Sequence, residues 1–261
     1  MTKFPKREKL NKIISFFKKK DLSALLEASQ ENKLKVNELQ KLNPYRPELV
    51  DLFNIYQIIV KNKRITSLEF GSGWSSLIIA LALRENKKKF NNHVKRLRRN
   101  NVFKNYAVDN EKKFLEISKK RLKQFDNNLL KDNYFLFSKA KLTTHDMRYV
   151  TEFEKLPKIN PDFIYLDGPD QFKIISKHKF NINHKDFAPM SADILKIEFF
   201  LNPGTIMLVD GRGLNCNFLK KYLKRNWSYK YIKFSDQHIF TLNQDIKGVH
   251  SQKLFDFFKK N

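Results

Sequence analysis

The segment Leu68-Glu-Phe-Gly-Ser-Gly-Trp-Ser-Ser76 contains two of the chain's seven glycines within three residues. Residues typical of a strand come before Gly71, and residues typical of a helix follow Gly73. Because glycine has no Cβ, such a turn leaves room for a ligand to approach the main chain. The following helix would then point its free N–H groups at that ligand. The segment predicts a ligand-binding loop, although a tight turn that needs glycine only for its dihedral angles explains the same residues.

Two carboxylates are expected close to this loop. The dinucleotide fingerprint G-x-G-x-x-G is incomplete, because Ser76 occupies the third glycine position and no acidic residue follows about 20 positions later. Instead, Glu69 stands two residues before Gly71, and Asp109 ends the next predicted strand. A carboxylate at the tip of that neighbouring strand can accept hydrogen bonds from both hydroxyls of a ribose. These residues predict a pocket for a nucleoside.

A mostly parallel sheet is expected to position these residues, because short apolar runs alternate with amphipathic helices from residue 65 onward. The predicted strands are 65–70, 106–108, 134–137, 163–166, 205–209, 229–234 and 238–242. The predicted helices are 75–83, 111–124, 192–200 and 217–225. Only Ser-Asp-Gln separates the last two strands, so these two must be antiparallel. Residues 1–62 are predicted to form an N-terminal helical extension, and residues 63–261 the main domain.

Four motifs follow one another at predicted strand ends. They are Leu68 to Ser76, Ala107-Val-Asp-Asn-Glu-Lys-Lys-Phe114, Asp162-Phe-Ile-Tyr-Leu-Asp-Gly-Pro169 and Gly204-Thr-Ile-Met-Leu-Val-Asp-Gly-Arg212. In this order they resemble the motifs of class I S-adenosylmethionine-dependent methyltransferases, most closely the branch with LEFGSG and DGP or DGR motifs. The resemblance covers residues 60–245. It implies an α/β fold with a Rossmann-like sheet of order 3-2-1-4-5-7-6, in which the last strand is antiparallel.

The resemblance also implies S-adenosylmethionine as the cofactor and gives the glycine loop a role in binding it. The residues expected around its methionine part are Glu69, Gly71, Ser72 and Gly73. Trp74 would pack under the cofactor or against the core of the protein.

The adenosine part of the cofactor is expected at the end of the second strand. In the resembling family, the position of Asp109 holds the ribose, and Asn110 would lie beside the adenine. His145 and Asp146, after the third strand, lie roughly where that family often binds the adenine amino group.

The chemical end of the pocket is expected at Asp167 and Asp210, which end the fourth and fifth strands, with Arg212 nearby. Methyl transfer to a hydroxyl needs a group that takes up its proton, and either carboxylate can do so. The two acids can alternatively hold Mg²⁺, as in catechol-type O-methyltransferases, but Gly211 stands where those enzymes have Asn as a third ligand. Arg212 can clamp an anionic acceptor. Structural hydrogen bonds and an ion pair of Arg212 with either acid are the alternatives to catalysis.

The net charge of +25, from 52 basic and 27 acidic residues, would attract nucleic acid, an anionic lipid surface or an acidic substrate. A lysine-rich surface without any partner gives the same total. The segment 84–101 concentrates positive charge with few aromatic residues, so as a nucleic-acid surface it would contact phosphates more than bases.

The single cysteine, Cys216, excludes an internal disulfide, and no run of about 18 apolar residues occurs. A soluble, cytoplasmic protein is therefore expected.

The leading hypothesis for function is a methyltransferase that acts on a small-molecule or glycan acceptor. Asp-Gly-Pro-Asp follows the fourth strand in place of the NPPY-type tetrapeptide of amino-methylating enzymes, so oxygen is the expected target atom. An RNA methyltransferase that uses the basic surface is one alternative. A nucleoside-binding protein without catalysis is another. The sequence determines neither the acceptor nor the oligomeric state.

Overall fold

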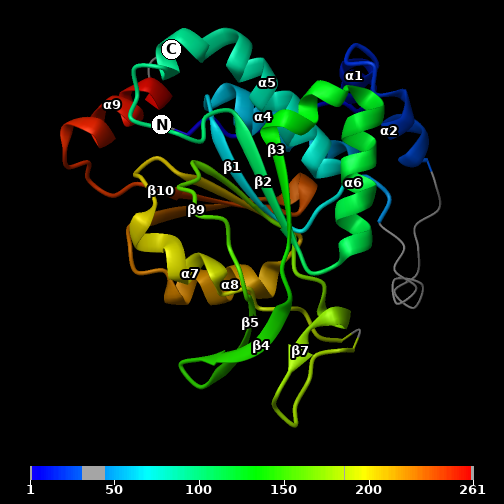
Figure 1. Cartoon of the computed structure of the whole chain (residues 1–261), viewed down its shortest axis with the longest axis vertical. Helices are drawn as coiled ribbons and strands as arrows, with labels where there is room; N and C mark the ends of the chain where they lie inside the picture. The colour runs from blue at the N-terminus through cyan, green and yellow to red at the C-terminus, as the bar shows by residue number, and fades with distance from the viewer. Residues whose placement is uncertain (1, 31–44, 185, 260–261) are drawn as a thin grey trace.

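A seven-stranded sheet forms the centre of the protein in the computed structural model, which describes residues 2–30, 45–184 and 186–259. Its strands are β1 (Thr66–Phe70), β2 (Lys104–Asp109), β3 (Asn133–Phe137), β6 (Phe163–Leu166), β8 (Ile206–Asp210), β9 (Trp227–Ile232) and β10 (Gln237–Leu242). They lie in the order β3-β2-β1-β6-β8-β10-β9 (Figure 1). Counted along the chain within this sheet, the order is 3-2-1-4-5-7-6, as predicted.

The last strand of the sheet runs against its neighbours. β10 pairs antiparallel with both β8 and β9, whereas β1 pairs parallel with β2 and β6, and the other pairings are also parallel. The link between β9 and β10 is too short for a crossover helix, so the chain must turn back on itself. The predicted α/β, Rossmann-like fold class is confirmed.

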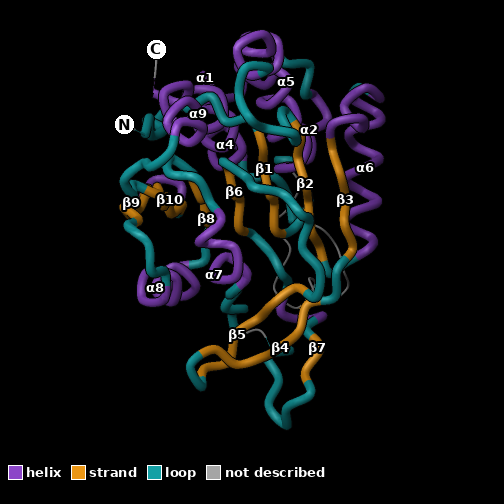
Figure 2. Tube along the Cα trace, turned by 60° about the vertical axis from the view of Figure 1, so that its left-hand side comes forward, coloured by secondary structure: helices purple, strands orange, loops and turns teal. Residues whose placement is uncertain are grey.

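Helices cover both faces of this sheet (Figures 1 and 2). α4 (Leu49–Lys61), α5 (Trp74–Val94) and α6 (Lys112–Phe125) lie on one face, and α7 (Asp193–Ile197) and α8 (Gly213–Tyr222) lie on the other. Successive side chains of a strand point to opposite faces. Accordingly, Phe163 and Tyr165 of β6 join the core under α4 and α5, and Ile164 and Leu166 join the core under α7 and α8.

Helices at the start of the chain complete the first of these layers. α1 (Leu10–Lys18) and α2 (Ser23–Ala28) bury Phe17 and Leu25 completely, in the same core as Ile55 and Ile59 of α4. Part of the predicted extension, residues 31–44, lies outside the described residues. The described helices of this region share one apolar core with the sheet.

α5 is longer than predicted, and this corrects the interpretation of the segment 84–101. The helix continues through Val94, so the first half of the basic segment forms its last turns. The side-chain amide of Asn86, which is fully buried, donates hydrogen bonds to the carbonyl oxygens of Ile59 and Arg64. Phe90 contacts Phe257 of α9 (Val249–Lys259). Buried contacts therefore extend the helix beyond the apolar stretch that was visible in the sequence.

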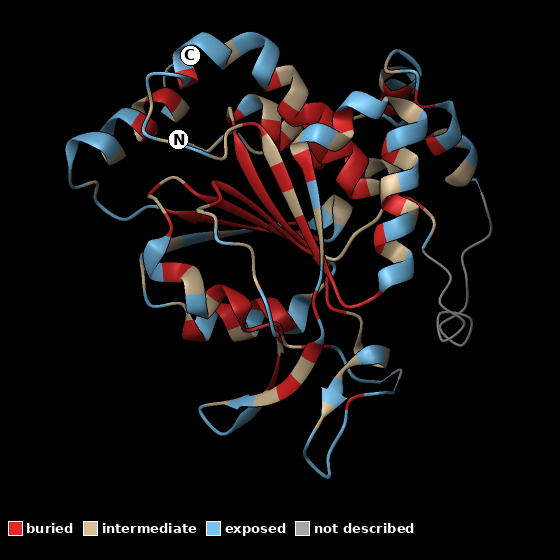
Figure 3. Ribbon diagram, in the orientation of Figure 1, coloured by how far each residue is buried: buried red, intermediate tan, exposed pale blue. Residues whose placement is uncertain are grey.

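A second, three-stranded sheet was not predicted. β4 (Ala140–His145), β5 (Arg148–Phe153) and β7 (Ile175–Ser176) pair in the order β5-β4-β7 and project below the main sheet, on the side to which β3 leads (Figures 1 and 2). We call these strands, together with residues 177–184 and 186–190, the arm. The buried core of the main sheet contrasts with the largely exposed tips of the arm (Figure 3). Strands with few apolar residues and a two-residue strand give little signal in a sequence. Within the described residues, no helix is long and apolar enough to cross a membrane.

Candidate functional site at the carboxyl edge of the sheet

The first glycine of the loop between β1 and α5 is required by a contact within the protein. Gly71 has a positive φ of 91°, and its N–H donates to the carbonyl oxygen of Val108 over 2.8 Å. A Cβ on Gly71 would lie 3.2 Å from main-chain atoms of Asp167 and Gly168. A Cβ on Gly168 would lie only 2.5 Å from the nitrogen of Gly71. These two glycines allow the loops after β1 and β6 to touch.

The second glycine of the loop has open space in front of it. Gly73 has an extended backbone, and a Cβ placed on it would meet only the Oγ of Ser75, at 3.8 Å. Among the residues that the structure describes, no atom explains the glycine at this position. Gly73 is therefore the residue of the loop at which a ligand can approach bare main chain.

Replacement by alanine is expected to lower the stability of the protein strongly at Gly168 and very little at Gly73. Gly168→Ala places a methyl group against the main chain of Gly71, and overpacking of this severity costs about 3 kcal/mol, or a fall of roughly 6–12 °C in melting temperature. Gly73→Ala meets no such obstacle and is expected to change stability by less than about 1 kcal/mol. Thermal unfolding of the two variants and the wild type tests this. Equal stability of the two variants would contradict the contact.

Asp109, at the end of β2, faces the glycine loop. It is 4% exposed, and its carboxylate accepts hydrogen bonds from the Oγ of Ser72 over 2.7 Å and from the N–H of Glu111 over 2.8 Å. Burial raises the pKa of Asp109 to about 6, while these hydrogen bonds act in the opposite direction. The main-chain N–H of Ser72 also bonds to this carboxylate. An ionised carboxylate can accept about four hydrogen bonds, so about one acceptor position is left for a ligand.

Glu69 holds the loop from beneath and does not reach the surface. It is fully buried, and its carboxylate accepts from the Oγ atoms of Ser75 and Ser76 over 2.5 and 2.8 Å. Asn105 of β2 adds a longer hydrogen bond of 3.3 Å. Burial raises the pKa of Glu69 to about 7. In the structure Glu69 fixes the first turn of α5 through Ser75 and Ser76, and its expected place around a ligand stays a prediction.

Asn110 lies next to Asp109 and has a free acceptor. Its Nδ2 donates long hydrogen bonds to the carbonyl oxygens of Asp170 and Lys173, at 3.4 and 3.5 Å. Its Oδ1 is buried and has no partner among the described residues. An unpaired buried carbonyl oxygen is costly, which points to a donor other than the described residues.

Two predicted positions lie elsewhere. Trp74 packs against the core on the α5 side, with the guanidinium of Arg121 4.2 Å from its ring centre, which matches the alternative of a core residue. Asp146 lies in the turn between β4 and β5, where its carboxylate accepts from the hydroxyl of Tyr222 and pairs with Arg148. His145 packs edge-on against the same Tyr222. Their contacts thus tie Asp146 and His145 to α8, and none of these contacts joins them to the glycine loop.

The end of β6 carries an accessible carboxylate. The side chain of Asp167 is 53% exposed, and its Oδ1 lies 3.8 Å from the Nε of Arg212. The same guanidinium donates to the carbonyl oxygens of Asp167 and Pro169 over 2.6 and 3.1 Å. Surrounding protein groups partly desolvate the carboxylate of Asp167, and the carboxylate of Asp210 lies nearby. Both effects raise the pKa of Asp167, to about 7.

Asp210, at the end of β8, is held more tightly. Its Oδ2 accepts from the hydroxyl of buried Tyr165 over 2.5 Å, and Gln237 also bonds to it. Burial raises the pKa of Asp210, and these two hydrogen bonds oppose the rise. Asp167 therefore has an oxygen available to a substrate, and Asp210 is engaged in the structure.

No sequence pattern pointed to Asp51 of α4, yet it belongs to this group of acids. Burial and the carboxylates of Asp210, Glu48 and Asp167 raise the pKa of Asp51 to about 8. The main-chain oxygen of Asp51 accepts from Gln237 on β10, which places the helix against the end of the sheet. A polar position on an amphipathic helix carries no signal of this kind, because only tertiary packing brings it to the strand ends.

Replacement of Asp51 by asparagine is expected to stabilise the protein at alkaline pH. The folded state holds the proton of Asp51 to about pH 8, whereas the unfolded chain releases it near 4, so wild-type stability is lost as pH rises between these values. Asparagine does not ionise, and the gain should reach at least about 1 kcal/mol at about pH 9. Denaturant unfolding at about pH 5 and about pH 9 measures it. A difference that does not grow with pH would contradict the expectation.

No group of three or more acidic, histidine or cysteine side chains in the described part of the chain is placed to hold a metal ion.

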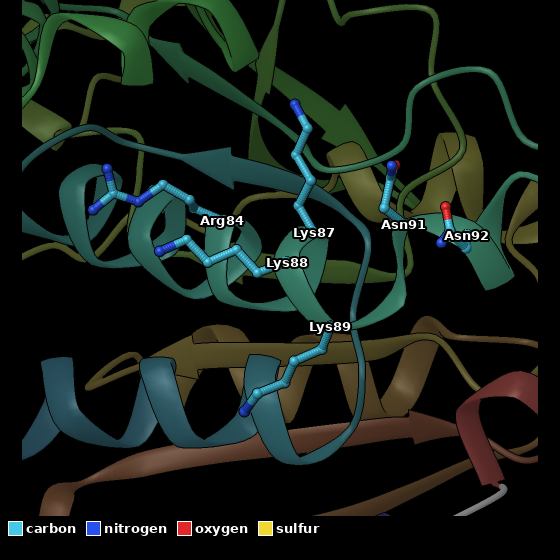
Figure 4. A pocket seen from close by; sticks show the side chains of 6 residues that line it. All are labelled: Arg84, Lys87, Lys88, Lys89, Asn91 and Asn92. Carbon is cyan, nitrogen blue, oxygen red and sulfur yellow. The ribbon is translucent and has the colours of Figure 1, made fainter.

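The basic turns of α5 line a surface depression of about 450 Å³, formed by Arg84, Lys87, Lys88, Lys89, Asn91 and Asn92. Their side chains point in different directions (Figure 4). Three of the cations are in ion pairs: Arg84 with Asp126, Lys87 with Asp132, and Lys89 with Glu85. This surface does not converge on a single ligand position.

Comparison with known proteins gives matches only among solved structures. No family model and no curated protein matches the sequence. An O-methyltransferase from Streptomyces achromogenes, TomG, matches with a TM-score of 0.46 and 12% identity over 85% of this chain and 90% of its own. A putative caffeoyl-CoA O-methyltransferase from Staphylococcus aureus matches with a TM-score of 0.47 and 13% identity over 86% and 99%. A methyltransferase from Geobacter sulfurreducens matches with 0.43 and 9% over 93% and 92%. At such low similarity, function has to be argued from the residues of this chain.

Proposed function

We propose that the protein is an S-adenosylmethionine-dependent methyltransferase that methylates an oxygen atom of a small-molecule or sugar-containing acceptor. The observation that carries the proposal is the carboxylate of Asp109, which bonds to Ser72 of the glycine loop and keeps an acceptor position free. The open main chain at Gly73 lies in the loop between β1 and α5, as Ser72 does. The unpaired Oδ1 of Asn110 lies in the loop between β2 and α6, directly after Asp109. A ribose and an adenine match these groups in chemistry.

The residues present fit an adenosine-bearing cofactor. Asp109 would accept a hydrogen bond from a ribose hydroxyl, and the orphaned Oδ1 of Asn110 would accept from the amino group of adenine. Gly73 would let the methionine part cross the loop. When bound, S-adenosylmethionine supplies a methyl group on a sulfonium. Glu69 would contribute indirectly, because it fixes Ser75 and Ser76 at the start of α5.

Asp167 is the group we assign as the base. Its carboxylate is accessible, and a pKa raised to about 7 suits a residue that takes up a proton near neutral pH. Arg212 would act as a positioning residue, because it binds the main chain of Asp167 and Pro169. Asp210 is already hydrogen-bonded to Tyr165 and Gln237. We therefore assign it a supporting role, as a carboxylate whose charge acts on Asp167.

Titration calorimetry with S-adenosylhomocysteine tests the proposal without knowledge of the acceptor. The wild type is expected to bind one equivalent. Gly73→Ala is expected to bind at least about tenfold more weakly at unchanged melting temperature, because its methyl group occupies the ligand's space. Absence of binding by the wild type would remove the proposal.

A further inference from the structure

The arm carries aromatic rings that the fold leaves open to solvent. Tyr149 near the start of β5 is 41% exposed. Phe180 and Phe187, in the loop that follows β7, are 37% and 41% exposed. The rings of Tyr149 and Phe180 are stacked, with centres 4.8 Å apart and planes 19° apart. Phe187 meets Phe180 edge-on at 5.4 Å. We call these three residues the aromatic platform.

The platform is not needed to anchor the arm. The loop is fixed by Ile182, which is 6% exposed, and by buried Pro189. On β5, Val150 and Phe153 point into the protein and are 1% and 2% exposed. Among the described residues, the three platform rings have one another and His178 as aromatic neighbours, and Phe187 also contacts His184. Exposed rings that hold one another in place form a surface for a ligand with flat faces.

The charge around the platform is positive. Lys177 and Lys179 are exposed on the same loop and form no ion pair with another described residue. Three acids on or beside the arm are paired with cations: Asp146 with Arg148, Glu152 with Lys196, and Glu154 with Lys141. Asp186 is exposed, and the nearby Nδ1 of His184 accepts a hydrogen bond from its main-chain N–H, so its charge is not neutralised there. Two unpaired lysines and one unpaired carboxylate thus lie next to the rings, which leaves a positive balance in a chain with a net charge of +25.

The segment between β6 and β7, which leads into this loop, borders the candidate cofactor site. Between Asp167 and the platform, the main chain of Asp170 and Lys173 accepts hydrogen bonds from Asn110. The ammonium of Lys173 pairs with Glu111 over 3.0 Å. One continuous segment thus carries the proposed base, borders the proposed adenosine position and presents two of the three exposed rings.

We propose that the aromatic platform binds single-stranded RNA, with bases stacked on Tyr149, Phe180 and Phe187 and phosphates at Lys177 and Lys179. Stacking on exposed rings together with nearby cations is how proteins hold single strands, whose bases are accessible. A neutral glycan or an apolar protein surface would leave the unpaired lysines without a role, and a duplex would hide the base faces. The uneven charge of the arm therefore favours a polyanion with aromatic bases.

The proposed reaction would use a ribose 2′-hydroxyl of this RNA, and this part rests on the proposed function. The hydroxyl oxygen forms a bond to the methyl carbon as the carbon–sulfur bond breaks. The bonding pair remains on sulfur, which becomes a neutral thioether, and the hydroxyl proton passes to Asp167. No oxidant or further reactant is needed.

Binding is tested by fluorescence anisotropy with a labelled, unstructured RNA of about 12 nucleotides, without cofactor. Tyr149→Ala and Phe180→Ala are each expected to weaken binding at least about fivefold. Phe199→Ala is the matched control, because Phe199 is a 69% exposed ring on the short helix Glu198–Phe200, outside the arm. Its affinity for RNA should equal that of the wild type. All three rings are exposed, and melting temperatures verify that the variants fold.

The lysines are tested by the salt dependence of the same binding. The double replacement of Lys177 and Lys179 by alanine is expected to reduce the slope of log affinity against log salt by about 1.4, or about 0.7 per lost phosphate contact. Lys88→Ala, on α5, is the control and should leave this slope unchanged. Ring variants that bind as tightly as Phe199→Ala, or an unchanged slope in the double variant, would overturn the platform.

Transfer of labelled methyl groups from S-adenosylmethionine tests the acceptor. The RNA is expected to become labelled, and DNA of the same sequence is not. Equal labelling of both would overturn the ribose assignment. If the platform variants bound RNA like the wild type while S-adenosylhomocysteine binding was normal, only this inference would be overturned. If the protein failed to bind S-adenosylhomocysteine, the proposed function would be overturned.

Discussion

Replacement of Asp109 by alanine is expected to weaken binding of S-adenosylhomocysteine by at least about tenfold. The variant loses the charged carboxylate that accepts from the ribose, and one hydrogen bond to a charged group contributes about 1.5–3 kcal/mol. Every 1.4 kcal/mol corresponds to about a tenfold change in the dissociation constant. Titration calorimetry of the variant and the wild type measures the ratio.

Asp109 also ties the glycine loop to β2, so a control must separate the two roles. Ser72→Ala removes the hydrogen bond of the loop to Asp109 but keeps the carboxylate for the ribose. It is expected to weaken binding less than about tenfold, as for one neutral donor. If Ser72→Ala and Asp109→Ala weakened binding equally, the carboxylate would act only through the loop.

The pH dependence of binding gives an independent check on Asp109. Its pKa of about 6 means that the carboxylate is ionised at neutral pH and becomes protonated as the pH falls below about 6. Protonation removes the charge that strengthens the hydrogen bond from the ribose. Affinity of the wild type should therefore fall on acidification, and affinity of Asp109→Ala should show no such step.

The second large effect is expected from Asp167→Asn, which should lower the rate of methyl transfer by about 100- to 10,000-fold. Asparagine keeps the size of the side chain but cannot take up the proton of the acceptor. Binding of S-adenosylhomocysteine should change less than about threefold, because Asp167 is assigned to the acceptor and not to the cofactor. Labelled-methyl transfer to the RNA, or to fractions of a cell extract with and without nuclease, measures the rate.

The rate of the wild type should also depend on pH in a defined direction. Only the ionised carboxylate accepts a proton, and the pKa of Asp167 is raised to about 7, so the rate should increase as the pH rises through about 7. Asp210→Asn serves as the control for charge at this end of the sheet. If Asp167→Asn transferred methyl groups at the wild-type rate, the base would have to be sought elsewhere. Cofactor binding without transfer to any acceptor would favour a nucleoside-binding protein.

Much of the fold could be predicted from local pattern. The apolar runs that became β1, β2, β3, β6 and β8 are short and bounded by turns, and the close spacing of the last two strands left no alternative to an antiparallel pair. The residues at strand ends followed, because a strand that ends at Asp109 places that side chain at the carboxyl edge of a parallel sheet. Periodicity and connection length are local properties, and the chain displays them directly.

The arm and the full length of α5 could not be predicted in this way. β4 and β5 stabilise each other by pairing across a turn, and the last turns of α5 are held by Asn86 and by Phe90 against α9. These contacts join residues that are distant in sequence or too polar to show a pattern. The contact of Asp146 with Tyr222 on α8 could not be predicted for the same reason, since it is formed by the β4–β5 turn.

The sequence by itself determined where the strands lie along the chain and which acids stand at their ends, because each depends on residues that are adjacent in the chain. The order of the strands within the sheet was implied by the family resemblance. Only the tertiary structure decided what those residues do. It showed that Gly71 makes room for Gly168 while Gly73 faces open space, and that Glu69 lies buried beneath the loop. It also brought Asp51 of α4 into the electrostatic neighbourhood of Asp167 and Asp210. Open space, burial and the interaction of distant charges arise from packing in three dimensions, which no local pattern records.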